Sequence, residues 1–219
     1  MRLPRFARPE PERDRARMVA EQLEARGISD PELLDAFRTV PRHEFVAGDA
    51  AYGDHALPLD AGQTISQPYV VARMTAAARP PEGWERANVL EVGTGSGYQA
   101  AILSHLGALV TTIERHNELA DQARERLGNA VTVIVGDGTN GWAERGPYRS
   151  ILVTAGGPSV PQPLLDQLDR SGGRLVMPVG DRRHQFLTLV ERAGDTFTTT
   201  ELEPVVFVPL IGRYALGEE

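Results

Sequence analysis

The chain has 219 residues, of which 41% are hydrophobic, so it can bury a sizeable core and we expect one domain over residues 1–219. Its formal net charge of −7 gives no basic field for a phosphate backbone, so no nucleic-acid partner is expected. All 23 basic residues are arginine and cysteine is absent, which excludes Schiff-base, thiol and thiolate-metal chemistry.

The N-terminal stretch MRLPRFARPEPERDRARM lacks the apolar core of a secretory signal, and no later run approaches the roughly 18 apolar residues of a membrane span. We therefore expect a cytoplasmic protein with no membrane partner. The five histidines show no metal-ligand spacing, so no metal site is expected.

Two helices are predicted near the N-terminus. The first spans residues 13–26 and ends at Gly27. The second has Asp30 as its N-cap and Pro31 as its first residue. These helices make a small helical preface, which we place within residues 1–80.

From residue 88 onward, short apolar strands alternate with helical segments. Strands are predicted at 88–92, 109–113, 131–135, 150–154 and 174–179, and helices between them at 98–106, 116–127 and 161–169. Near-continuous apolar strands are typical of a parallel sheet that is covered on both faces. We therefore expect residues 81–219 to form a doubly wound, mostly parallel α/β core of Rossmann-like type. Two further runs, 185–190 and 205–210, lack an intervening helix and predict an antiparallel edge that completes seven strands.

A glycine-rich turn, VLEVGTGSGYQAA, follows the first strand of this sheet, where open α/β sheets bind their ligands. A dinucleotide fingerprint would need glycine at position 98, where this chain has Tyr98. The pattern E-x-G-x-G-x-G resembles motif I of the class I S-adenosylmethionine-dependent methyltransferases. That resemblance implies S-adenosyl-L-methionine as cofactor and S-adenosyl-L-homocysteine as product. The candidate cofactor-binding residues here are Glu91, Gly93, Thr94, Gly95, Ser96 and Gly97.

Two further strand ends carry acidic residues. Glu114 closes the second strand of the sheet, where it can accept both ribose hydroxyls of an adenosine, or else be a solvated carboxylate at a helix start. Asp137 and Gly138 end the third strand, where the aspartate can meet the adenine amino group, or else form a plain Asp-Gly turn. Together the three strand ends predict an adenosine site.

Several long stretches closely resemble the protein-L-isoaspartate O-methyltransferases, from about residue 12 to residue 213. They include AYGDHALPLDAGQTISQPYVVARMT, VLEVGTGSGYQAAIL and VTAGGPSVPQPLLDQLDRSGGRLVMPVG. The motif around GQTISQPY is more specific to that family than the glycine-rich turn. The resemblance implies methylation of the α-carboxylate of L-isoaspartyl residues in damaged proteins and peptides, whose esters cyclise to a succinimide. It leaves the acceptance of D-aspartyl residues open.

The same resemblance implies that Ser66 is the catalytic residue, and that the four residues Gln63, Thr64, Ile65 and Ser66 border the cofactor. Spacing alone favours Ser66 as a helix N-cap before Pro68. The acceptor carboxylate, with a pKa of about 3.5, is ionised at neutral pH and needs no general base. The task of the enzyme is then in-line positioning with water excluded.

Two alternative functions remain. One is an aspartate-directed methyltransferase of a biosynthetic peptide, whose sequences usually carry a long C-terminal extension; here the sequence stops at residue 219, soon after VPLIG. The other is a catalytically silent S-adenosylmethionine-binding interaction module, against which the intact Ser66 and Glu91 argue. We expect a monomer that repairs isoaspartyl proteins.

Overall fold

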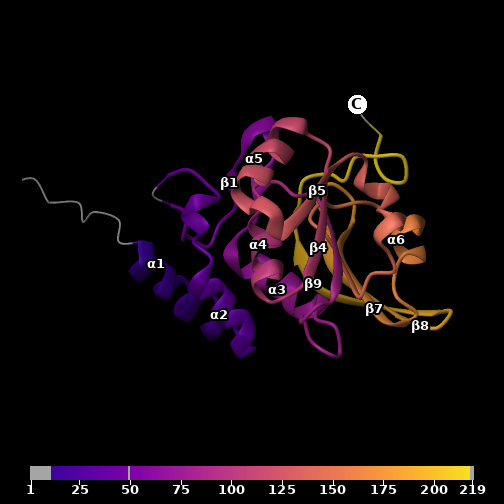
Figure 1. Ribbon diagram of the computed structural model, residues 1–219, viewed down its shortest axis with the longest axis horizontal. Helices are drawn as coiled ribbons and strands as arrows, with labels where there is room; N and C mark the ends of the chain where they lie inside the picture. The colour runs from indigo at the N-terminus through magenta and orange to yellow at the C-terminus, as the bar shows by residue number, and fades with distance from the viewer. Residues whose placement is uncertain (1–10, 49, 218–219) are drawn as a thin grey trace, which may run out of the picture.

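The computed structural model describes residues 11–48 and 50–217. Seven strands form its main sheet: β3 (Asn88–Val92), β4 (Leu109–Glu114), β5 (Val131–Val135), β6 (Ser150–Val153), β7 (Ser171–Gly180), β8 (Gln185–Ala193) and β9 (Thr196–Val205). Their order across the sheet is β5-β4-β3-β6-β7-β8-β9 (Figure 1). The strands from β5 to β7 pair in parallel, and β8 and β9 are added antiparallel. The predicted doubly wound sheet with an antiparallel edge is confirmed.

Within the described part of the chain, six α-helices accompany the sheet: α1 (Pro11–Met18), α2 (Pro31–Thr39), α3 (Pro68–Ala78), α4 (Tyr98–His105), α5 (Asn117–Leu127) and the short α6 (Gln162–Asp166). Figure 1 shows α3, α4 and α5 against one side of the sheet and α6 on the other. None of the helices within the described ranges is long and apolar enough to cross a membrane.

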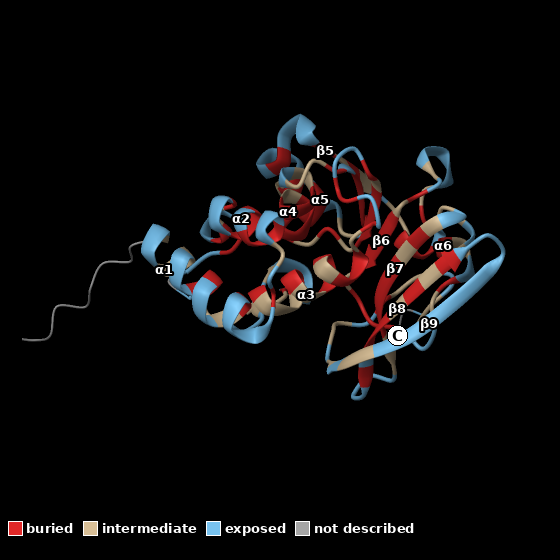
Figure 2. Ribbon diagram, turned by 90° about the horizontal axis from the view of Figure 1, so that it is seen from below, coloured by how far each residue is buried: buried red, intermediate tan, exposed pale blue. Residues whose placement is uncertain are grey.

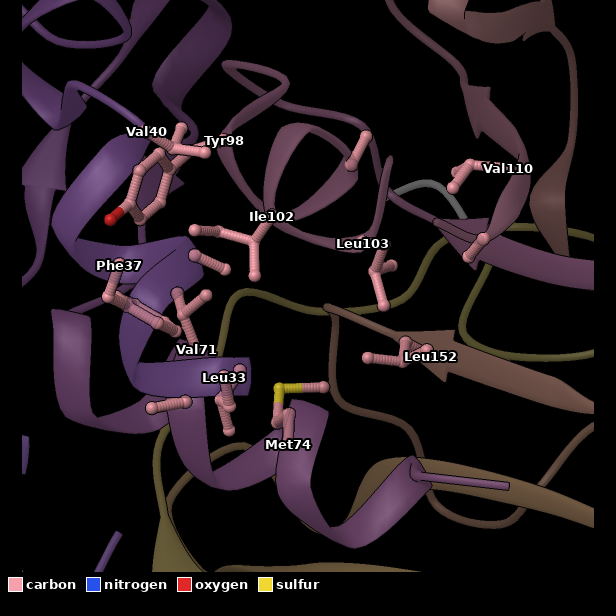
Figure 3. Close-up of a cluster of buried hydrophobic side chains, with 14 of the residues drawn as sticks. Leu33, Phe37, Val40, Val71, Met74, Tyr98, Ile102, Leu103, Val110 and Leu152 are labelled. Atoms are coloured by element: carbon pink, nitrogen blue, oxygen red, sulfur yellow. The ribbon is translucent and has the colours of Figure 1, made fainter. Parts of the chain in front are cut away.

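Both faces of the parallel strands are buried, which explains their near-continuous apolar sequences. Side chains alternate between the faces: Leu152 of β6 joins the cluster beneath α2 to α5, whereas its neighbours Ile151 and Val153 join the cluster beneath α6. In Figure 3, Met74 of α3 and Leu103 of α4 lie in the first cluster together with Leu152.

The helical preface packs against the sheet-covering helices. Asp30 caps α2 as predicted, because its carboxylate accepts hydrogen bonds from the backbone of the first turn. Phe37 of α2 meets the ring of Tyr98 edge-on, with 6.0 Å between centroids (Figure 3). The helix predicted over 13–26 is present as one helical run that stops at Gly27 with φ +90°, but only its first part, α1, is α-helical; a π-helical turn and a 3₁₀ turn follow.

The last strand differs from its prediction. The apolar run 205–210 was expected to form it, but β9 is the preceding, threonine-rich segment, and it lies exposed at the edge of the sheet (Figure 2). An exposed edge strand needs few apolar residues, so its sequence carried no apolar signal. The apolar run serves another purpose, because residues 206–211 line cavities at the sheet's ligand-binding end.

Candidate active site

An open cavity of about 870 Å³, counting the space at its mouth, lies at the carboxyl ends of β3, β4 and β6. One border is the loop around the small ribbon of β1 (Leu57–Pro58) and β2 (Thr64–Ile65), and another is the segment 208–211. The candidate residues that line the cavity are Gln63, Thr64, Ile65, Ser66, Glu91, Gly93, Thr94, Gly95, Ser96, Glu114 and Gly138. The structure therefore brings together residues from three strand ends and from the loop at residues 63–66. We call this loop, which carries Thr64, Ile65 and Ser66, the TIS loop.

The glycine-rich turn presents bare backbone to this cavity. Gly93 has φ +94°, and a Cβ there would collide with the Thr154 hydroxyl, which donates to the Gly93 carbonyl at 2.7 Å. Gly97 has φ +90° and begins α4, where a Cβ would press on Leu127 at 3.1 Å. Gly97 does not line the cavity, so its part is to shape the turn.

Glu91 is fully buried, and only one of its two carboxylate oxygens accepts a hydrogen bond from the part of the chain that the structure describes. Its Oε2 accepts a hydrogen bond from the Thr112 hydroxyl at 2.5 Å, and Thr112 in turn lies 2.7 Å from the Thr94 hydroxyl. Glu91 lines the cavity, and its Oε1 is buried with no hydrogen-bond partner among the described residues. Burial raises the pKa of Glu91 to about 8, a rise that the Thr112 hydrogen bond opposes and the charge of Glu114 increases. A ligand with a cationic or hydrogen-bond-donating group would satisfy this oxygen.

Glu114 is buried and tied to the turn, so it is not a solvated surface carboxylate. It is 5% exposed, and its Oε2 accepts from the Gly95 amide at 2.9 Å while its Oε1 accepts from the His116 amide at 3.0 Å. Each carboxylate oxygen retains acceptor capacity after one hydrogen bond. The pair of oxygens at the cavity wall can thus accept two further hydroxyl groups.

The Asp137 carboxylate binds to its own turn and to the C-terminal segment. Asp137 does not line the cavity, because its carboxylate accepts hydrogen bonds from the amide and hydroxyl of Thr139 at 2.9 and 2.7 Å and from the Arg213 amide at 2.8 Å. These bonds fix the turn after β5 and hold the C-terminal segment against it. Gly138 is the residue of this pair that faces the cavity.

Ser66 lies where the cavity meets a second, adjoining groove. The two share Thr64 and Ser66, and the far side of the groove is formed by Gln185, Val206 and Phe207. Ser66 is half-buried, and it lines both spaces. The predicted N-cap role is wrong, because Gln67 is the N-cap of α3 and no side chain caps that helix.

Arg42 is a site residue that the sequence did not reveal. Its guanidinium is fully buried, donates to the carbonyls of Ala51 at 2.7 Å and Ser66 at 2.8 Å, and stacks 5.0 Å from the centre of the Tyr98 ring. Burial lowers the pKa of Arg42 to about 10, so it remains charged at neutral pH. The preface thereby fixes the backbone of Ser66. No local pattern marks this arginine in the sequence, because its partners lie 9 and 24 residues further along the chain.

Comparison with known families agrees with this geometry. The family model described as Protein-L-isoaspartate(D-aspartate) O-methyltransferase (PCMT) matches residues 14–215. The chain belongs to this family. A PCMT-family relative from Methanospirillum hungatei JF-1, named protein-L-isoaspartate O-methyltransferase, is 50% identical over 213 residues, covering 94% of this chain and 97% of the relative.

Solved structures of the PCMT family share the fold. One, named protein-L-isoaspartate O-methyltransferase, superposes with a TM-score of 0.80 at 28% identity, over 92% of this chain and 67% of its own. Another, a putative member from Plasmodium falciparum in complex with S-adenosyl-L-homocysteine, has a TM-score of 0.75 at 22% identity over 88% of this chain and 96% of its own. The second comparison bears on the fold alone.

Proposed function

We propose that this chain transfers the methyl group of S-adenosyl-L-methionine to the α-carboxylate of L-isoaspartyl residues in damaged proteins and peptides. The observation that carries the proposal is the place of Ser66, which lies between a cavity suited to the cofactor and a groove open to an acceptor. Family membership over residues 14–215 supports the reaction and its substrate class.

The residues of the cavity fit the cofactor. Glu91 has an unpartnered buried oxygen for the amino-acid tail, the Gly93–Gly97 turn offers bare backbone, and Glu114 has acceptor capacity for ribose hydroxyls. When bound there, S-adenosyl-L-methionine supplies an electrophilic methyl group on a sulfonium. We propose that Gln63, Thr64 and Ile65 border it from the TIS loop.

Ser66 orients the acceptor. A carboxylate with a pKa of about 3.5 is already the nucleophile at neutral pH, so the hydroxyl donates a hydrogen bond rather than removing a proton. The Arg42 guanidinium holds the Ser66 carbonyl, which limits where that hydroxyl can point. The TIS loop and the segment 208–211 border the reacting atoms and exclude water from them.

We further propose that the protein works as a monomeric, single-domain enzyme in the cytoplasm and has no nucleic-acid partner. The net charge of −7 supports the last point, since a phosphate backbone would be repelled. The shared cluster of α2, α3, α4 and the sheet supports a single domain, because residues from the preface and the core bury one another.

The test is methyl transfer to a pair of short peptides that differ only in one isoaspartyl or aspartyl linkage. We expect labelled methyl groups from S-adenosyl-L-methionine to appear, as base-labile esters, on the isoaspartyl peptide alone. Methylation of the aspartyl peptide would instead favour an aspartate-directed enzyme. Cofactor binding without transfer to either peptide would favour the silent interaction module, and both results would overturn the proposal.

A further inference from the structure

The segment after β9 forms a wall between the cofactor cavity and the adjoining groove. We call residues 206–211 the wall segment. Val206 and Phe207 line the groove, whereas the next four residues, 208–211, line the cavity. The position of one short stretch of backbone therefore sets the width of both spaces.

The wall segment is anchored on both of its sides. On the cavity side, the Gly156 amide donates to the Val208 carbonyl at 2.8 Å, and the Leu210 amide donates to the Gly156 carbonyl at 2.7 Å. On the groove side, the side-chain amide of Gln185 accepts from the Phe207 amide at 2.8 Å and donates to the Phe207 carbonyl at 3.4 Å.

The Gln185 side chain is buried and packs closely against Gly156. It is 3% exposed, and its amide lies so close to Gly156 that a Cβ on that glycine would come within 2.5 Å of Nε2. The Gln185 amide pairs with both backbone polar groups of Phe207, as a neighbouring strand would, and its loss leaves these two part-buried groups without that partner.

We propose that Gln185 is a positioning residue that fixes the groove side of the wall segment for the acceptor peptide. The inference rests on the proposed function, because it takes the groove beside Ser66 as the place of the peptide. Since the Gly156 anchor remains when Gln185 is replaced, the cavity side keeps its place and the groove side loosens. The effect should fall on the peptide, not on the cofactor.

The chain offers a matched control. Gln167 makes the same kind of clamp, accepting from the Trp142 amide at 2.7 Å and donating to the Asn140 carbonyl at 2.8 Å. It too lies against a glycine, Gly141, whose Cβ would collide with the amide. Gln167 lines neither the cavity nor the groove, so its replacement removes a clamp without touching the wall segment.

The experiment compares Gln185→Met and Gln167→Met, which keep side-chain length and remove both hydrogen bonds. For Gln185→Met we expect the KM for an isoaspartyl peptide to rise about fivefold to twentyfold, the factor for loosening one or two neutral hydrogen bonds. Its kcat should change less, and its affinity for S-adenosyl-L-homocysteine should stay within about twofold, since the Gly156 anchor remains. Gln167→Met should lower the thermal midpoint comparably and leave the peptide KM unchanged.

Amide hydrogen exchange at Phe207 gives a readout that needs no activity. It should be slow in the parent protein and in Gln167→Met, and at least about tenfold faster in Gln185→Met, because the amide loses its acceptor. If Gln185→Met does not fold, Gln185→Asn, whose amide is one methylene too short to reach, takes its place. An unchanged peptide KM, or unchanged exchange at Phe207, would overturn the proposal. A parent protein that exchanges slowly at Phe207 yet methylates no isoaspartyl peptide would instead refute the proposed function.

Discussion

At the scale of single residues, Ser66 lines both the cavity and the groove, and its carbonyl is held by Arg42. Because Ser66 caps no helix, Ser66→Ala should leave the thermal midpoint nearly unchanged. We expect methyl transfer to an isoaspartyl peptide to fall by roughly tenfold to a thousandfold, as when one positioning donor is removed. Cofactor affinity, measured by calorimetry on the same sample, should largely persist. A folded, cofactor-binding and fully active variant would remove Ser66 from the mechanism.

Glu114 offers a test of the cofactor site. Glu114→Ala should weaken the binding of S-adenosyl-L-homocysteine by roughly 2–4 kcal/mol, the scale for charge-assisted hydrogen bonds lost together. Glu114→Gln should lose less, because one acceptor oxygen remains. Glu118→Ala is the control, since Glu118 is an exposed carboxylate in the first turn of α5. Calorimetry that finds equal affinities for Glu114→Ala and Glu118→Ala would contradict the assignment.

Glu91 predicts a pH dependence of stability. Its pKa in the folded protein is raised to about 8, above the unfolded value, so between these two values the folded state binds the extra proton. The free energy of unfolding contributed by this group therefore falls as pH rises from about 4.5 to about 8, and is level above that range. Urea unfolding from pH 5 to pH 9 should show a steeper decline in the parent protein than in Glu91→Gln. Parallel curves for the two proteins would show that Glu91 is ionised when folded.

At the scale of elements, the strands with two buried faces were predictable from the sequence. Two elements that differ from their predictions, the last strand and the last helix, do so for physical reasons. The bounds of β3 and β5 match their predictions residue for residue, because an apolar run between a turn and a helix has few alternatives. The sequence did not predict strand β9, because this edge strand is exposed to solvent and therefore needs few apolar residues. The helix predicted over 161–169 shortens to α6, because Leu168 bridges to Tyr148 as extended backbone instead of continuing the helix.

The candidate site was predictable only where the sequence pattern marks backbone shape. The glycines of the turn and the acid at the end of β4 have such patterns, and the structure places them together at the cavity, apart from Gly97. Arg42 and the Gln185 clamp depend on contacts between segments far apart in the chain, which no local spacing encodes. Asp137 has the expected position in sequence, but its carboxylate is occupied by Thr139 and Arg213.

At the scale of the whole molecule, the cavity joins the preface, the sheet and the wall segment. A ligand that binds only the folded state stabilises it by about 2.7 kcal/mol at a concentration of 100 times its Kd. For a domain of this size, we expect S-adenosyl-L-homocysteine to raise the thermal midpoint by about 5–10 °C in one cooperative transition. Calorimetric scans with and without ligand check this. Two separate transitions would show that the preface unfolds independently of the sheet.

The hydrogen bonds of Asp137 also bear on chemical ageing. An isoaspartyl residue forms in two steps. The amide nitrogen of the next residue attacks the side-chain carboxyl carbon and expels water to give a succinimide, and water then opens the ring at the α-carbonyl. A following glycine hinders the first attack least. Asp137 is followed by Gly138. Burial alone would raise the pKa of Asp137, but hydrogen bonds from Arg213 and Thr139 lower it, and an ionised carboxylate is a poor electrophile. The bonds that fix the turn thus protect the enzyme from the lesion that it repairs in other proteins, at a dipeptide beside its own cofactor cavity.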